Sequence, residues 1–456
     1  MKIKASLLIA LIFISVSGCK KTGKAINESQ WQTTDSIHQR LAAGIIYEVN
    51  IRQITPEGTF KAFTEQHIDR LKNLGVDILW LMPLYPISVK NRKGTLGSYY
   101  SVADYKAVNP EFGTLDDLKE LVKKAHEAGM LVIFDWVANH TGWDNVWISA
   151  HPDWYTRNEK NEIIAPVPDW SDVADLNYDN PELRKAMIDA LEYWVREAGI
   201  DGYRCDAAAM APTKFWNEAL MSLDSIRPLI KLAEAWEPEL MANGFDAAYG
   251  WEFHHLLNGI AKGSKKLADI GNYLAKADTL YAGDDMLMNF ITNHDENSWA
   301  GTEYERMGNY VKGFAALTYL MPGIPMIYTG QEAGLNKRLR FFEKDTISWS
   351  DTTLYDFYRK LNRLKHNNPA LRAGIAAGAI HFAADSLSQI ITLQRISGKN
   401  KVLGIFNFSD HTVSTKWPLL GINGTYREIF SGEKTKIRRN TRWELTPWEF
   451  KVLENE

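Results

Sequence analysis

The chain has 456 residues, of which 45% are hydrophobic and 24% are charged, as is ordinary for a folded soluble protein. This length accommodates one large α/β domain and a smaller second domain. The formal net charge of −4 and the absence of a basic run argue against a protein that binds nucleic acid.

The first residues resemble a bacterial secretion signal. Lys2 and Lys4 precede an apolar stretch at 7–16, and small residues lead up to Cys19. Small residues directly before a cysteine resemble the lipobox of bacterial lipoproteins, whose cysteine is lipidated. We therefore expect a signal peptide at 1–18 and a lipidated tether at 19–40. A plain signal peptide with a chance cysteine is the alternative.

A lipidated Cys19 would attach the protein to a membrane of the bacterial cell envelope. The residues after it are Lys20, Lys21, Thr22 and Gly23, without the acidic cluster that resembles a surface-export signal in some bacteria. This favours the periplasmic face over the cell surface. The other cysteine is Cys205, so a lipidated Cys19 leaves no partner for a disulfide.

From about residue 41 to 367, short apolar runs alternate with helical patterns. The alternation predicts a (β/α)8 barrel, whose usual size is roughly 250 residues before insertions. A doubly wound open sheet is the alternative, but the first strand lacks the Gly-rich phosphate loop that such a sheet usually carries. The expected strands are 45–51, 78–84, 131–137, 202–208, 228–235, 247–252, 289–294 and 325–330.

Helix signals stand between these strands. Thr114 and Asp117 can cap a helix that runs to Ala128, where Gly129 ends it. Asn180 followed by a proline opens a second helix. Further helices are expected at 304–320 and 354–367.

Two segments fall outside this alternation. Residues 141–179, rich in Trp, Asp and Pro, are too long for an ordinary connection and predict a small irregular subdomain inserted after the third strand. Residues 368–456 show short strand patterns with turn signals and no helical period, which predicts a C-terminal antiparallel β-sandwich domain. Strands are expected there at 389–396, 402–407, 425–429 and 443–453.

Three acidic residues close three different apolar runs in the barrel region: Asp206, Glu234 and Asp295. A carboxylate at the tip of a buried strand is costly to desolvate unless it is paired or used. Because functional residues of such barrels lie at the carboxyl ends of the strands, we expect the three acids to meet at one mouth. Separate ion pairs or helix caps are the structural alternative.

The surroundings of two of these acids predict different charge states. Arg204 and Asp206 are two residues apart on one strand and face the same way, so the guanidinium favours the ionised carboxylate. Glu234 follows an apolar run and faces two other acids, which favours its protonated form. An ionised nucleophile beside an acid of raised pKa is the division of labour in retaining glycoside hydrolysis.

The chain resembles the α-amylase superfamily, glycoside hydrolase family 13. The matching motifs occur in family order between about Tyr47 and Glu332, and a C-terminal β-domain is also usual there. Residues 135–140 resemble the family's third-strand motif, Asp-x-x-x-Asn-His. The other segments that match family motifs are 175–177, 202–207, 233–235, 293–295 and 323–332.

The resemblance implies roles for individual residues. Asp206 would be the nucleophile, Glu234 the general acid/base, and Asp295 a third carboxylate that holds substrate hydroxyls. Arg204 would orient Asp206. His140 and His294 would bind the sugar that is attacked.

Three further residues complete the implied site. Tyr100 would stack on the same sugar. Asp104 and Asp135 would support the residues that touch it.

One departure from the family concerns calcium. Many α-amylases carry Lys-His three and four residues after the nucleophile, where they line the site and supply a carbonyl to calcium; Ala209 and Met210 stand there in this chain. Asn139 and Asp175 remain at family calcium-ligand positions, and a carbonyl of Met210 could join them. The resemblance thus leaves calcium as a candidate cofactor, and it calls for no organic cofactor.

The expected function is that of a lipid-anchored, retaining hydrolase that cleaves α-1,4 bonds of starch, glycogen or maltodextrins. A transglycosylase or a trehalose-synthase-like isomerase, which passes the same intermediate to a sugar, is the first alternative. A non-catalytic glucan-binding lipoprotein is the second. The sequence leaves endo or exo action open.

Overall fold

The computed structural model describes residues 14–15, 37–281, 283–418, 421–438 and 440–456. Cys19 and nearly all of the predicted signal peptide and tether therefore lie outside the described residues. The last residues of the predicted tether instead begin helix α1 (Ile37–Ala43), because Leu41 is buried there.

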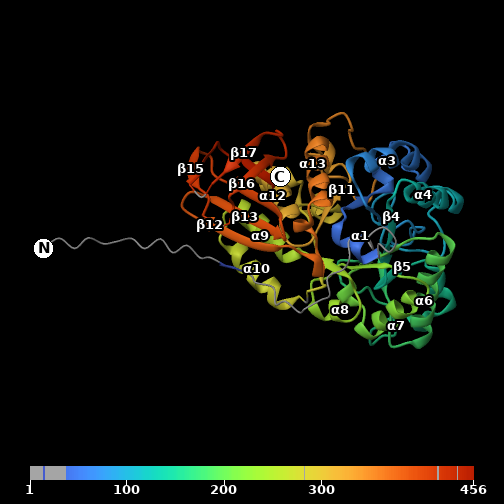
Figure 1. The fold of residues 1–456 in the computed structure, drawn as a ribbon. Coiled ribbons are helices and arrows are strands. Elements are labelled where there is room, and N and C mark those ends of the chain that lie inside the picture. The colour runs from blue at the N-terminus through green and yellow to red at the C-terminus, as the bar shows by residue number, and fades with distance from the viewer. Residues whose placement is uncertain (1–13, 16–36, 282, 419–420, 439) are drawn as a thin grey trace.

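The centre of the molecule is a closed barrel of eight parallel strands, as the alternation predicts (Figure 1). Its strands are almost entirely buried, which is why they read as continuous apolar runs. The barrel closes where the last strand pairs with the first. The strands are β2 (Ile46–Val49), β3 (Ile78–Leu81), β4 (Leu131–Val137), β7 (Gly202–Asp206), β8 (Ile230–Ala233), β9 (Ala247–Tyr249), β10 (Met286–Asn289) and β11 (Ile324–Tyr328).

Helices surround the barrel, and two of them begin as expected. Thr114 and Asp117 form a reciprocal capping box at the start of α4 (Leu115–Glu127), and Asn180 caps α6 (Pro181–Glu197). The other helices of ten residues or more are α3 (Phe60–Leu74), α7 (Thr213–Asp224), α9 (Trp251–Ala261), α10 (Asp269–Leu280), α12 (Val311–Leu320) and α13 (Thr353–Asn367).

Three expectations about these elements were wrong. The strand expected at 247–252 is β9, which ends at Tyr249, and helix α9 begins at Trp251. The strand expected at 289–294 is β10, which ends at Asn289; its last partner is Pro325, which has no N–H to extend the ladder. Asp295 therefore lies in the loop after the strand. The helix expected at 304–320 is broken into α11 (Glu303–Met307), a 3₁₀ turn and α12, because Gly308 has a φ of 52°.

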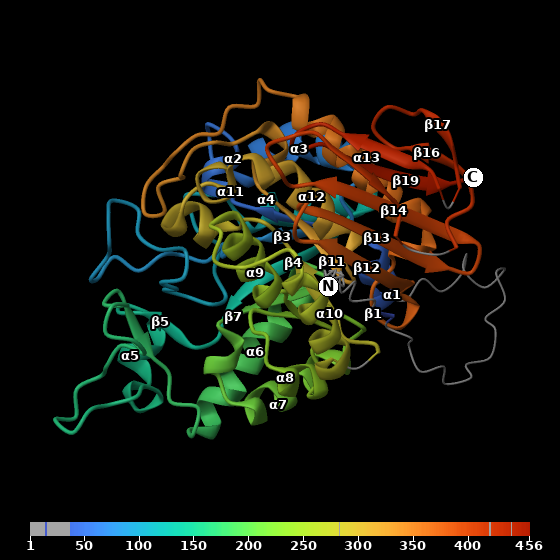
Figure 2. The same ribbon diagram turned by 90° about the vertical axis from the view of Figure 1, so that its left-hand side faces the viewer.

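The inserted segment projects from the barrel beside its carboxyl end. It contains the short antiparallel pair β5 (His140–Gly142) and β6 (Val173–Asp175), with α5 (Val146–Ala150) between them. Figure 2 shows it on the opposite side of the molecule from the C-terminal strands.

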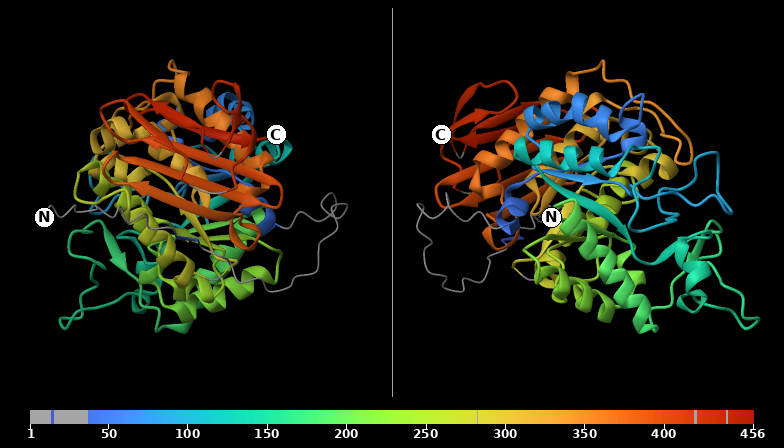
Figure 3. Two further views of the ribbon diagram at one scale, coloured as in Figure 1. Left: turned by 60° about the vertical axis from the view of Figure 1, so that its left-hand side comes forward. Right: turned by 90° about the vertical axis from the view of Figure 1, so that its right-hand side faces the viewer.

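The C-terminal region consists of antiparallel sheets, as expected. The larger sheet has the order β12-β13-β14-β19-β16-β17, with the two-residue β1 (Ile14–Ser15) beside β12, and it lies against the barrel near α12 (Figure 3). A smaller sheet pairs β15 (Val413–Lys416) with β18 (Arg442–Leu445). The larger sheet comprises β12 (Ala379–Asp385), β13 (Ile390–Ser397), β14 (Asn400–Asn407), β16 (Gly424–Glu428), β17 (Lys434–Ile437) and β19 (Phe450–Asn455).

The run expected as one strand at 443–453 is two strands, β18 and β19, in different sheets. The break falls at Trp448, whose φ is 62°. No helix in the described part of the chain is long and apolar enough to cross a membrane.

Candidate active site

The three acids lie around one cavity of about 1040 Å³ at the carboxyl end of the barrel. Asp206 is the last residue of β7, and Glu234 directly follows β8, the neighbouring strand. Asp295 reaches the same cavity from the loop after β10. The barrel thus brings together three carboxylates that are far apart in the sequence.

Arg204 connects two of these acids through a single guanidinium. Its Nη1 donates to Oδ1 of Asp206 at 2.8 Å, and its Nη2 lies 2.8 Å from Oε1 of Glu234. Nη1 also donates to Oδ1 of Asp135 at 2.8 Å. The alternation along β7 predicts the contact with Asp206, whereas the ion pair with Glu234 comes from the neighbouring strand and was not foreseen.

Aromatic side chains enclose this guanidinium. Its Nε donates to the hydroxyl of Tyr249 at 3.1 Å, and its central carbon lies 4.9 Å from the ring centre of Trp80. Arg204 is fully buried, so the carboxylates and the rings replace its water shell. A buried cation held in this way is fixed in position.

Asp206 and Glu234 both have raised pKa values. Burial is the largest cause for both, and Arg204 opposes it. The pKa of Asp206 rises to about 6, because burial outweighs the Arg204 effect on which the sequence-based expectation was built; the pKa of Glu234 rises to about 7, in the expected direction. Glu234 thus has the higher pKa of the two, which is the order that a proton donor beside an ionised nucleophile requires.

The acid/base candidate has a second contact that fixes it. The backbone N–H of Ala207 donates to Oε2 of Glu234 at 2.8 Å. Both carboxylate oxygens of Glu234 are therefore held, one by this amide and one by Arg204.

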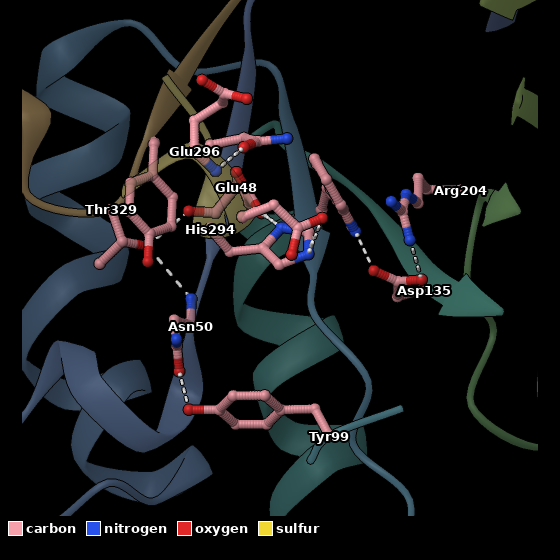
Figure 4. Close-up of polar contacts among 12 residues, drawn as sticks. Glu48, Asn50, Tyr99, Asp135, Arg204, His294, Glu296 and Thr329 are labelled. Atoms are coloured by element: carbon pink, nitrogen blue, oxygen red, sulfur yellow. Dashed lines mark hydrogen bonds and ion pairs between the residues drawn. The ribbon is translucent and has the colours of Figure 1, made fainter. Parts of the chain in front are cut away.

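A hydrogen-bonded network extends from Glu48 and His294 to Asp135, which Arg204 also contacts (Figure 4). The hydroxyl of Tyr100 is 3.1 Å from Oδ2 of Asp135 and 2.8 Å from Nε2 of His294. His294 in turn contacts Oε1 of Glu48 through Nδ1 at 2.5 Å, and its Nε2 lies 3.4 Å from Oδ2 of Asp295. Four of the predicted site residues thus belong to one network.

The two predicted histidines differ in charge. Burial lowers the pKa of His140 to about 4, so this ring is neutral at pH 7. Burial also lowers the pKa of His294, but Asp295 and Glu48 raise it more strongly, to about 9. The sequence did not separate these two roles.

Tyr100 lines the cavity with its ring almost parallel to that of Phe341, at 6.3 Å between centres. Exposed apolar side chains stand at the rim: Met210 is 44%, Trp236 is 51% and Trp299 is 55% exposed. The cavity thus combines charged groups at its base with flat apolar surfaces at its mouth.

Asp104 lies apart from this network. Its carboxylate accepts a hydrogen bond from the backbone of Lys106 within the same turn, at 2.9 Å. The hydrogen bond of Asp104 is therefore local to its turn, and its supporting role stays a prediction.

The two calcium-ligand candidates are neighbours across the β5–β6 pair. Asp175 pairs with His140 in this ladder, and the backbone of Leu176 donates to the carbonyl of Asn139 at 3.2 Å. Within the described residues, no group of three or more His, Cys, Asp or Glu side chains could hold a metal ion. Calcium at Asn139 and Asp175 stays a prediction.

Sequence reasoning missed three polar contacts of this site. Glu48 carries the charge that faces His294, Trp80 donates its Nε1–H to Oδ2 of Asp135 at 3.0 Å, and Tyr249 accepts from Arg204. A glutamate in the middle of the apolar run 45–51 was the one available signal.

The chain matches the family model described as "Alpha amylase, catalytic domain" over residues 29–165 and 153–375, which together exceed half of its length. The chain belongs to the α-amylase family.

Curated relatives and solved structures agree with this. An α-amylase of Haloarcula japonica is 26% identical over 407 residues, covering 85% of this chain and 58% of the relative. A cyclomaltodextrinase of a Bacillus species is 28% identical over 370 residues, covering 75% and 64%. The chain thus spans less than two thirds of the length of these relatives.

Two crystal structures are similar over nearly their whole length. An α-amylase from Lactobacillus plantarum has a TM-score of 0.81 and 29% identity, covering 91% of this chain and 100% of that one. A maltogenic α-amylase from Thermotoga neapolitana has a TM-score of 0.82 and 29% identity, covering 91% and 99%.

Proposed function

We propose that the protein is a retaining α-glucan hydrolase that cleaves α-1,4-glucosidic bonds of starch, glycogen or maltodextrins. The observation that carries the proposal is the pairing of Asp206 and Glu234 on one buried guanidinium at the mouth of a family-typical barrel. The names of the similar proteins, α-amylase, cyclomaltodextrinase and maltogenic α-amylase, support the substrate class.

In the first step, a carboxylate oxygen of Asp206 attacks the anomeric carbon. The glycosidic C–O bond breaks, and Glu234 gives its proton to the departing oxygen. Arg204 stays in place and balances the negative charge that shifts between the two carboxylates.

In the second step, Glu234, now ionised, takes a proton from a water molecule. The water oxygen attacks the anomeric carbon, and the ester bond to Asp206 breaks. Both residues return to their starting states, and the sugar keeps its α configuration.

The side chains around Asp206 suit a polyhydroxylated ring. Tyr100 supplies a flat face, while His140 supplies a neutral ring nitrogen. Asp295 supplies a partly exposed carboxylate, with 41% of its side chain accessible, that can accept from sugar hydroxyls.

The test is turnover of maltoheptaose by Asp206→Asn and Glu234→Gln. Both variants should lose about 10³-fold or more in kcat, because each lacks a group that forms or breaks a bond. Retention of the wild-type rate by either variant would remove that residue from the role proposed here.

Transfer to a sugar acceptor is the second candidate. Transfer requires a sugar acceptor to bind near Glu234 in place of water. Trp236 and Met210 line the cavity and expose apolar surface on which such a sugar could pack. Shorter reducing sugars from maltoheptaose would indicate hydrolysis, and longer chains or isomers would indicate transfer.

We also propose that lipidation of Cys19 anchors the protein to the periplasmic face of the cell envelope. Support comes from the pattern of lysines, apolar residues and small residues before this cysteine. Wild-type protein should partition into detergent, and Cys19→Ala should remain in the aqueous phase. Equal partitioning of the two would contradict the anchor.

A further inference from the structure

Glu48 is a buried carboxylate that the proposed reaction does not use. It lies on β2 with no exposed surface, and its Oε1 is 2.5 Å from Nδ1 of His294. Its other oxygen, Oε2, has no hydrogen-bond partner in the described part of the chain. A buried carboxylate with one close ionic partner depends on that partner for its charge.

The hydrogen atoms of the network determine the state of His294. The hydroxyl of Tyr100 has one hydrogen, and a carboxylate oxygen of Asp135 lies 3.1 Å away as its acceptor. Nε2 of His294 lies 2.8 Å from the same hydroxyl and can donate to it when the hydroxyl donates to Asp135. With Nδ1 2.5 Å from Oε1 of Glu48, both ring nitrogens then have an acceptor, as an imidazolium requires.

We propose that Glu48 is a positioning residue that keeps His294 protonated and turns its Nε2–H edge toward Tyr100 and Asp295. The inference deepens the proposed function, on which it rests, by adding a residue that acts through another. The pair contributes no net charge, and its positive end lies next to Tyr100 and Asp295, which line the cavity. Oδ2 of Asp295 lies 3.4 Å from Nε2, so this edge of the ring is placed beside the carboxylate proposed to accept from sugar hydroxyls.

The other charged and titratable groups around the pair are consistent with this state. Burial raises the pKa of Glu48, while His294 and Arg204 oppose this. Asp295 raises the pKa of His294, and Arg204 lowers it. The groups that face the pair from the surrounding strands and loops are Tyr100, Asp135, Arg204, Tyr249, Asp295 and Tyr328.

The direct test is a nitrogen NMR titration of the histidine rings in the full, ligand-free protein. The signals of His294 are assigned by their absence in His294→Asn. In the wild type they should be those of an imidazolium at pH 7 and should titrate near pH 9. In Glu48→Gln, which keeps an acceptor oxygen but no charge, the midpoint should fall by at least about one pH unit, the change expected from losing one close charge.

The kinetic test uses maltoheptaose at pH 7. Glu48→Gln should lower kcat/KM about 10- to 100-fold, as expected when one charged hydrogen bond is weakened. Glu303→Gln removes another buried carboxyl, on α11, and should leave both the kinetics and the titration of His294 unchanged.

Neutral His294 in the wild type at pH 7 would overturn the inference, and so would an unchanged midpoint in Glu48→Gln. If Glu48→Gln does not fold, the same titration is made on Glu48→Asp, whose shorter side chain withdraws the carboxylate from Nδ1, and an unchanged midpoint there would overturn the inference. Since the titration needs no substrate, it is independent of the proposed function, which is tested by the activity of Asp206→Asn.

Discussion

The backbone N–H of Ala207 donates to Oε2 of Glu234 from a left-handed conformation. Ala207 has φ 41° and ψ 45°, which a residue with a Cβ rarely adopts and which costs on the order of 1 kcal/mol. Ala207 directly follows Asp206. This turn therefore places the amide of Ala207 and the carboxylate of Asp206 on the side of Glu234. Strain is therefore stored next to the two carboxylates that we propose to be catalytic.

Substitution of Ala207 tests this turn. Ala207→Gly should change the free energy of unfolding by less than about 0.5 kcal/mol, because lower strain offsets the greater freedom of the unfolded chain. Ala207→Val should cost about 1–3 kcal/mol, since a β-branched residue tolerates positive φ poorly. Denaturant unfolding measures both. A valine variant as stable as the wild type would contradict the strain.

The pH dependence of kcat/KM follows from the raised pKa values of Asp206 and Glu234. Activity requires ionised Asp206 and is lost as the pH falls below about 6; it requires protonated Glu234 and is lost as the pH rises above about 7. We expect a narrow, bell-shaped pH profile of kcat/KM with apparent pKa values near about 6 and about 7. A plateau from pH 5 to 9 would show that other groups control the rate.

Asp206→Asn should be inactive but more stable at pH 8. The raised pKa means that the contribution of Asp206 to stability is present below its ordinary pKa of 3.8 and is lost as the pH rises through about 6. Above pH 7, the difference between the ordinary and the raised pKa of Asp206 corresponds to at most about 3 kcal/mol of unfolding free energy. Asparagine keeps an oxygen for Arg204 without the buried charge.

Thermal unfolding at pH 8 and pH 4 measures this effect. The gain in stability of Asp206→Asn over the wild type should be largest at pH 8. It should be small at pH 4, where Asp206 is largely protonated. Asp410→Asn, whose side chain is 88% exposed, should change stability by less than about 0.5 kcal/mol at either pH. A variant less stable than the wild type at pH 8 would contradict the assignment of buried charge.

Arg204→Lys should damage both stability and catalysis. A lysine keeps the charge but cannot reach three carboxylates with a planar fork. We expect a loss of about 3 kcal/mol in unfolding free energy and of about 100-fold or more in kcat. The matched control is Arg338→Lys, which alters an exposed pair with Glu305 and should have no effect on either. Wild-type kinetics in Arg204→Lys would show that the shared guanidinium is dispensable.

The sequence predicted the barrel because its strands are short buried runs between capped helices. The contact of Arg204 with Asp206 was also predictable, since residues two apart on a strand share a face. The family motifs then singled out the carboxylates that gather at one cavity.

The remaining features depend on neighbours that are distant in sequence. Glu48 was overlooked because one glutamate inside an apolar run gives no indication of its partner, and His294 lies 246 residues away. The end of β10 was misplaced because it is decided by Pro325 on the next strand. Pairing across strands, rather than local pattern, determines both.

The central claim is that Asp206 forms a covalent bond to the sugar. The most direct measurement is mass spectrometry of Glu234→Gln after incubation with α-maltosyl fluoride, whose good leaving group permits the first step without an acid. We predict a maltosyl ester on Asp206 that disappears with time. An adduct on another residue, or a first-formed product of β configuration, would contradict the account.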